Sequence, residues 1–160
     1  MSLSVLADVL SFTGHVALAL WFGSMIFLGF VTAPALFSGL PRAEAARSMA
    51  VIFSAYYRFG TGCGAAIVLA AGLRAVVSGP SALQGSVLVV VSAMLALTLY
   101  AWRSLLPRVE QARRRAESAD PTEGAFDRTY FKRLHAHSMR INVMIMVLGL
   151  LGLWVAWLSG

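Results

Sequence analysis

The chain has 160 residues, of which 59% are hydrophobic and only 12% are charged, whereas soluble domains carry about 25% charged residues. A soluble protein of this length has too little interior to hide so much apolar surface, which excludes a soluble domain and indicates an integral membrane protein in contact with the lipid bilayer. The net charge is +6, and the basic residues lie between apolar segments. This distribution fits contact with lipid headgroups and control of membrane topology better than binding of a nucleic acid.

The first apolar stretch, residues 9–37, is long enough to cross about 30 Å of hydrocarbon at a tilt. A secretory signal peptide has a basic region before its apolar core. Here the first Lys or Arg is Arg42, so we expect a permanent span. Pro34 is expected to kink the end of this span. A turn is predicted at residues 39–41, with Pro41 at the first position of the next helix.

The second and third spans are expected at residues 49–77 and 82–106, separated by a helix-breaking Ser-Gly-Pro-Ser run. Cys63 lies inside the second span. It is the only cysteine, so we interpret it as a small buried apolar residue. Gly60 and Gly64 have a spacing that permits close helix packing, either within the bundle or between protomers.

Residues 107–133 carry most of the charge and precede the fourth span, residues 134–158. Asp120, Pro121 and Glu123 form a helix-start pattern. A helix from residue 121 to 158 is roughly 57 Å long, which exceeds the hydrocarbon thickness. The predicted fold is therefore all-α: one membrane domain, an antiparallel up-down four-helix bundle whose third and fourth helices extend into a charged cytoplasmic hairpin. Disorder in part of this hairpin is the alternative.

Orientation follows from the positions of Lys and Arg, which favour cytoplasmic connections. Of the 13 Lys and Arg residues, three lie at the first connection and nine at the third. Arg74 alone lies near the other side. We therefore expect a multi-pass protein of the cell's inner (plasma) membrane, with both termini outside the cytoplasm.

Polar side chains inside membrane spans are costly and are functional candidates by default. Three of them in the fourth helix are spaced i, i+3, i+7 and share one face, which we expect to point into the bundle while His137 points away. Aromatic and basic residues of the second helix lie at a similar depth. Together these side chains form a candidate polar site: Tyr56, Tyr57, Arg58, His135, Ser138 and Asn142.

Two members of this set also have simpler interpretations. His135 suits a structural hydrogen bond where helices cross, and Arg58 suits a side chain that extends to lipid phosphate. Asn142 lies deepest, so it is expected to find a partner on the first or second helix.

His15, Trp21 and Arg74 are secondary candidates. Two histidines on facing helices can hold haem or copper, but helical rise places His15 and His135 about 25–30 Å apart. No cofactor is therefore expected, and haem or copper binding remains an alternative. Arg74 either extends to the outer membrane interface or pairs with Asp8. Intramembrane thioethers can bind copper(I), but packing is the favoured interpretation for Met25, Met94, Met144 and Met146.

Landmarks along nearly the whole chain resemble the family of transmembrane protein 205. They are Trp21 and Gly23 in the first span, Leu40-Pro41-Arg42 at the first turn, Phe53 with Tyr56-Tyr57 in the second helix, and Leu134, His135, Ser138 and Asn142 in the fourth. The resemblance implies a four-span fold and a His–Ser–Asn face. Because its eukaryotic members are associated with resistance to platinum drugs, it also implies export or trafficking of soft-metal compounds.

No catalytic motif occurs in the sequence, which favours a non-enzymatic role. The first hypothesis is transport or export of a small solute or soft-metal species by a homo-oligomer, since four spans are few for a complete pathway. The second is a membrane binding or scaffold protein that docks a protein partner on its basic hairpin. The third is a haem- or copper-binding membrane protein.

Overall fold

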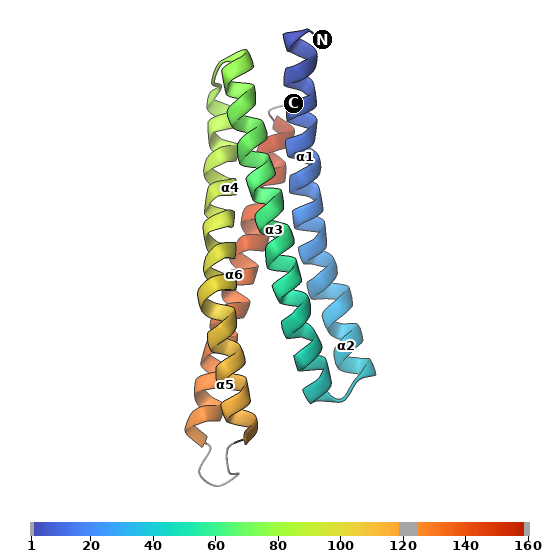
Figure 1. The fold of residues 1–160 in the computed structure, drawn as a ribbon, viewed down its shortest axis with the longest axis vertical. Coiled ribbons are helices and arrows are strands. Elements are labelled where there is room, and N and C mark those ends of the chain that lie inside the picture. Colours follow the sequence, from blue (N-terminus) through green and yellow to red (C-terminus); the bar gives the residue numbers. More distant parts are fainter. Residues whose placement is uncertain (1, 119–124, 159–160) are drawn as a thin grey trace.

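A computed structural model describes residues 2–118 and 125–158, and the regular structure in these ranges is entirely helical (Figure 1). This confirms an all-helical fold with four helical runs long and apolar enough to cross a membrane. In chain order the elements are α1 (Leu3–Phe27), the π-helical turn η1 (Leu28–Thr32), α2 (Ala33–Gly39), α3 (Arg42–Ser78), α4 (Ala82–Tyr100), the π-helical turn η2 (Ala101–Leu105), α5 (Leu106–Ser118) and α6 (Ala125–Leu158).

The turns between the runs are short and follow local sequence. Pro41 is the N-cap of α3, and its carbonyl accepts hydrogen bonds from the amides of Glu44 and Ala45. The prediction that Pro41 is the first helical residue is therefore wrong by one position, because its extended backbone lets it cap the helix that starts at Arg42. Gly79 ends α3 with a φ of 81°, a conformation that favours glycine. The helix start predicted at residues 120–123 lies outside the described residues.

Both π-helical turns end two residues before a proline, Pro34 in α2 and Pro107 in α5. In each turn, the residue before the proline donates its amide to the carbonyl five residues earlier. Proline has no N–H and crowds the carbonyl four residues before it, and a wider turn relieves that crowding. The irregularity expected at Pro34 thus takes the form of a π-helical turn, and the sequence prediction missed the equivalent one at Pro107.

The four runs lie along the length of the molecule (Figure 1). The two marked ends of the chain and the turn between α3 and α4 lie toward one end of it. The turn between α2 and α3 and the α5–α6 pair lie toward the other. Helix α1 packs on α3 and α6, α4 packs on the same two helices, and α5 packs on α6. Figure 1 also shows α5 and the start of α6 diverging from α2 and the start of α3.

The core runs along the axis of this bundle, and the outer surface is apolar as well. The largest fully buried side chains are those of Trp21, Tyr57, Leu18, Met94, Leu105, Ile145, Val91 and Thr98. Exposed large hydrophobics occur on every long helix of the described chain. An apolar exterior of this extent fits contact with lipid.

Candidate functional site

The candidate polar site contains one pair that joins two helices. The Tyr57 hydroxyl of α3 donates a hydrogen bond to Asn142 Oδ1 of α6 at 3.2 Å. The Asn142 amide nitrogen donates in turn to the Ser138 carbonyl at 3.1 Å. The expected partner for Asn142 on the first or second helix is thus found on the second. This hydrogen bond connects α3 to α6, two helices that otherwise pack on α1 and α4 rather than on each other.

Two other members of the predicted set lie outside this arrangement. Arg58 and His135 are both exposed, so the prediction that His135 points into the bundle is wrong. Its ring stacks on Phe131 of its own helix, with centroids 5.8 Å apart. His135 does share a helical face with Asn142, as the i, i+7 spacing requires. The start of α6, however, packs on α5, and Figure 1 shows it diverging from the start of α3.

The prediction that His137 faces away from the bundle is also wrong. His137 is half-buried, and its Nε2 lies 3.3 Å from the Tyr100 hydroxyl of α4. The two rings are in edge-to-face contact, with centroids 6.2 Å apart. Helix α6 packs on both α1 and α4, so a side chain turned away from one neighbour can turn toward the other.

Trp21 and Tyr56 belong to the packed middle of the bundle. The Trp21 side chain is fully buried, and Tyr56 is 6% exposed. Gly60 and Gly64 make room for the indole ring: a Cβ on Gly60 would lie 2.9 Å from Trp21 Cδ1, and one on Gly64 would lie 3.0 Å from Trp21 Cζ3. The glycine spacing noted in the sequence therefore serves packing within the bundle. Cys63 is buried beside it, as expected.

Three buried polar atoms in this packed middle lack a hydrogen bond of good geometry to any described residue. They are Trp21 Nε1, the Tyr56 hydroxyl oxygen and Thr98 Oγ1. The Trp21 indole and the Tyr56 hydroxyl interact with each other, so these two side chains partly satisfy one another. Thr98 Oγ1 is left without a hydrogen bond among the described residues, which is costly for a buried polar group.

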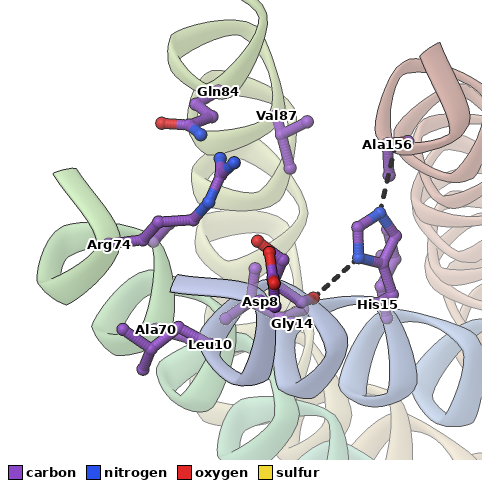
Figure 2. Close-up of a pocket in the computed structure, with 13 residues that line it drawn as sticks. Asp8, Leu10, Gly14, His15, Ala70, Arg74, Gln84, Val87 and Ala156 are labelled. Carbon is purple, nitrogen blue, oxygen red and sulfur yellow. Dashed lines mark hydrogen bonds between the residues drawn. The ribbon is translucent and has the colours of Figure 1, made fainter. Parts of the chain in front are cut away.

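A cavity of about 250 Å³ lies at the end of the bundle where the chain ends are found (Figure 2). Its walls come from α1, α3, α4 and α6. The apolar part of the lining includes Leu10, Leu18, Ile67 and Val87, and the polar part is Asp8, Ser11, His15, Arg74 and Gln84. We call this the outer pocket.

His15 forms one wall of the outer pocket and connects α1 to α6. Its Nδ1 lies 2.7 Å from the Ser11 carbonyl oxygen, and its Nε2 lies 3.1 Å from the Ala156 carbonyl oxygen. Figure 2 shows both contacts. A carbonyl oxygen only accepts hydrogen bonds, so the neutral ring donates to one carbonyl at a time and the charged ring donates to both. In either protonation state, both ring nitrogens face carbonyl oxygens of the protein.

Arg74 and Asp8 line the same pocket, but no ion pair joins these two described residues. The alternative that they pair directly with each other is therefore wrong. The Arg74 guanidinium lies against the Gln84 side chain instead, and the amide accepts from it when its oxygen is turned that way. The pocket thus holds a guanidinium and a carboxylate that face one space without neutralising each other (Figure 2).

Two of the three secondary candidates, His15 and Arg74, line the outer pocket, whereas Trp21 does not. Sequence reasoning missed Gln84 and Ser11, and it considered Asp8 only as a partner for Arg74. The available signal was the clustering of polar residues within the outer turns of three separate helices. The described residues contain no group of three or more His, Cys, Asp or Glu side chains that could hold a metal ion.

A family profile described as "Domain of unknown function (DUF4149)" matches residues 16–118, which is more than half of the chain. This range includes Trp21, Arg74 and Gln84 but not Asp8, His15 or any part of α6. No curated protein and no solved structure matches the chain.

Proposed function

The chain belongs to the DUF4149 family, a domain of unknown function, and for this member we propose a role in moving a small polar solute across the membrane. The outer pocket is the observation that carries the proposal. Ionisable residues within membrane helices mark substrate pathways when they face a cavity. Asp8 and Arg74 do so without pairing, and they come from different helices.

The donor chemistry of the pocket favours a solute with charges or hydrogen-bonding groups over a soft-metal species. Soft metals prefer thiolate and thioether ligands, whereas the polar lining here consists of a carboxylate, a guanidinium, an imidazole, an amide and a hydroxyl. Cys63 and Met94 are buried in the core and do not line the pocket. Export of soft-metal compounds is therefore the less favoured version of the same transport proposal.

A transport cycle requires the packed middle to open. The buried side chain of Trp21 closes the proposed solute route beyond the outer pocket. The Tyr57–Asn142 and Tyr100–His137 contacts lie farther along this route. The buried polar atoms of Trp21, Tyr56 and Thr98 supply hydrogen-bonding groups for a solute passing between the outer pocket and these two contacts. Four spans are few for a complete pathway, so we expect a homo-oligomer.

In this proposal the outer pocket opens on the non-cytoplasmic side of the inner (plasma) membrane. The asymmetry of Lys and Arg supports that orientation, because basic residues favour cytoplasmic connections. The bundle is then antiparallel, with both termini outside and the α5–α6 hairpin in the cytoplasm. The resemblance to transmembrane protein 205 is consistent with a role in export.

Flux into proteoliposomes tests the proposal. Purified protein would be reconstituted and supplied with labelled amino acids, small organic acids, organic amines, copper(I) and a platinum complex. We expect uptake of at least one polar solute above that of empty liposomes, and a loss of about tenfold or more in Arg74→Gln. The matched control is Arg58→Gln, which removes an exposed guanidinium from the same helix. The absence of flux for every probe would rule out the transport role.

A scaffold role is the second candidate, and the composition of the hairpin surface favours it. Helix α5 exposes Arg108 and Arg115, and α6 exposes Lys132 and Arg133. An exposed basic surface suits an acidic protein partner. In a crosslinking experiment on the full chain in membranes, neutralising these four residues with Gln should remove protein crosslinks at the hairpin. Unchanged crosslinks would count against the scaffold role.

A further inference from the structure

We propose that the outer pocket binds a zwitterion, with its ammonium group against Asp8 and its carboxylate or phosphate group against Arg74. This inference rests on the proposed function only in taking the outer pocket as the solute site. It adds the chemical class of the ligand.

The Asp8 carboxylate is the anionic element of the site. It makes no hydrogen bond or ion pair in the described structure, although it lines the cavity. Figure 2 shows its oxygens directed into the space between Arg74 and His15. A primary ammonium group offers three donors to such an acceptor.

Arg74 is the cationic element of the site. Its guanidinium carries five N–H donors, and Gln84 accounts for at most two of its nitrogens. The remaining donors form the planar arrangement that binds carboxylate or phosphate with two parallel hydrogen bonds. Figure 2 shows the Arg74 side chain of α3 directed at the Gln84 side chain of α4.

His15 is not available as the charge partner of a ligand. Both of its ring nitrogens are directed at backbone carbonyls of α1 and α6. The ring therefore positions these two helices, and the recognition of charge falls to Asp8 and Arg74.

The separation of the two charges is the main argument for a ligand with both charges. Asp8 is exposed and Arg74 is half-buried, and a ligand with one charge would neutralise one of them and leave the other facing the cavity without a partner. A zwitterion compensates both at once. The volume of about 250 Å³ is below the range of about 300–1,000 Å³ typical of drug-sized ligands, so it suits a small molecule or one headgroup. The apolar walls at Leu10, Leu18 and Val87 accommodate a short alkyl segment between the charges.

Two sources offer this chemistry. One is a free amino-acid-like solute, and the other is the headgroup of a surrounding phosphatidylethanolamine molecule, which carries a phosphate and a primary ammonium group. The pocket lies toward one end of the four apolar helical runs, and the ends of membrane-spanning helices are where headgroups are expected.

Calorimetric titration of the full chain in phosphatidylglycerol nanodiscs tests the ligand class. The zwitterionic probes are β-alanine, γ-aminobutyrate and O-phosphoethanolamine, and the singly charged analogues are propionate and propylammonium. We expect at least one zwitterion to bind at least tenfold more tightly than either analogue. Asp8→Asn and Arg74→Gln should each reduce this preference about tenfold. Arg58→Gln and Asp127→Asn are the matched controls, and all variants would first be checked for an unchanged unfolding temperature.

The lipid arm distinguishes the two sources. If phosphatidylethanolamine in the nanodisc competes with O-phosphoethanolamine, and native mass spectrometry shows that it is retained over phosphatidylglycerol, the headgroup is the occupant. If a zwitterion binds and the lipid does not compete, the occupant is a free solute. Equal binding of zwitterions and single-charge analogues, no binding of any zwitterion, or no effect of either pocket variant would overturn the proposal.

Failure of this inference is distinguishable from failure of the transport role. Zwitterion binding without flux of any probe would leave the ligand class standing and remove transport. Flux that depends on Arg74 but involves a singly charged solute would leave transport standing and remove the zwitterion.

Discussion

Charged side chains gather at both ends of the molecule, but the two groups are organised in opposite ways. On α5, Arg113 forms ion pairs with Glu110 and Glu117, and Arg114 pairs with Glu110 as well. At the outer pocket, Asp8 and Arg74 face one cavity and do not pair. The first group completes its interactions within one helix, whereas the second leaves opposite charges for something else to neutralise. Charge content alone therefore does not identify a candidate site, whereas opposite charges left unpaired at a cavity are a specific reason to propose one.

A tightly packed middle separates the two ends of the bundle, and the first prediction tests that packing with a substitution at Gly60. Gly60→Ala places a Cβ 2.9 Å from Trp21 Cδ1 and closer still to its Nε1. Because both helices are fixed by their neighbours, the ring has to move, and overpacking of this kind costs about 1–3 kcal/mol. We expect the unfolding temperature in detergent to fall by about 2–12 °C.

Gly62→Ala is the matched control on the same helix, because a Cβ there meets nothing within 4 Å. It should leave the unfolding temperature unchanged or raise it slightly, since alanine favours helix more than glycine does. Equal destabilisation by the two substitutions would show that Trp21 is not seated on Gly60, and that the middle is less closely packed than its geometry indicates.

The second prediction concerns the contrast between paired and unpaired charge. Arg113→Gln removes ion pairs with two carboxylates from a side chain that is only 10% exposed. Since hydrogen bonds to charged groups are worth about 1.5–3 kcal/mol and exposed ion pairs about 0–1 kcal/mol, we expect a net loss near 1–2 kcal/mol of unfolding free energy. Arg74→Gln should change the unfolding free energy by less than about 0.5 kcal/mol.

Chemical unfolding in mixed detergent micelles measures this difference. Arg114→Gln serves as the control on α5, because that side chain is 75% exposed and its ion pair should contribute little. If Arg74→Gln destabilised the protein as much as Arg113→Gln, the outer arginine would be structural, and the contrast between the two ends would disappear.

The third prediction compares how much two hydrogen bonds between helices, Tyr57–Asn142 and Tyr100–His137, contribute to stability. Tyr57→Phe removes the hydroxyl that donates to Asn142 Oδ1 between α3 and α6. Hydrogen bonds between membrane helices contribute about 0.6 kcal/mol on average and up to about 1.7 kcal/mol, so we expect a loss of about 1 kcal/mol. Tyr100→Phe should cost less, because the Tyr100–His137 contact is longer and more exposed. The opposite order in the same unfolding assay would show that the bundle is held at Tyr100 rather than at Tyr57.

Sequence patterns predicted the number and approximate limits of the helices because long apolar runs and the glycine-proline breaks between them are strong local signals. Helical spacing also correctly placed Ser138 and Asn142 on one face. It could not show that the start of α6 diverges from the start of α3 and leaves His135 exposed, because the relative course of two helices is a tertiary feature. In membranes both the core and the lipid-facing surface are apolar, so hydrophobicity does not reveal which face is buried.

The outer pocket could not be predicted from local sequence patterns, for a related reason. Asp8, Arg74 and Gln84 come from the outer turns of three helices, and each suits an interfacial side chain when considered alone. Only the packing of α1, α3 and α4 brings them around one cavity. The sequence suggested proximity of Asp8 and Arg74 but could not show that they remain unpaired.

The smallest expected effect is a pH dependence of the unfolding free energy that arises from the ion pairs of α5. The hydrogen bond from Arg113 is the main cause that lowers the pKa of Glu110, and Arg114 lowers it further. Because the folded pKa lies below the unfolded value, which is about 4.3 for glutamate, the unfolded state binds more protons as the pH falls. The stabilisation from Glu110 is therefore complete above the unfolded pKa and is lost as the pH falls through the folded pKa. Unfolding free energies of the parent protein and Glu110→Gln should thus differ most near neutral pH and converge in acid. A constant difference between the parent and Glu110→Gln down to the acid limit would mean that the α5 ion pairs contribute nothing through the ionisation of Glu110.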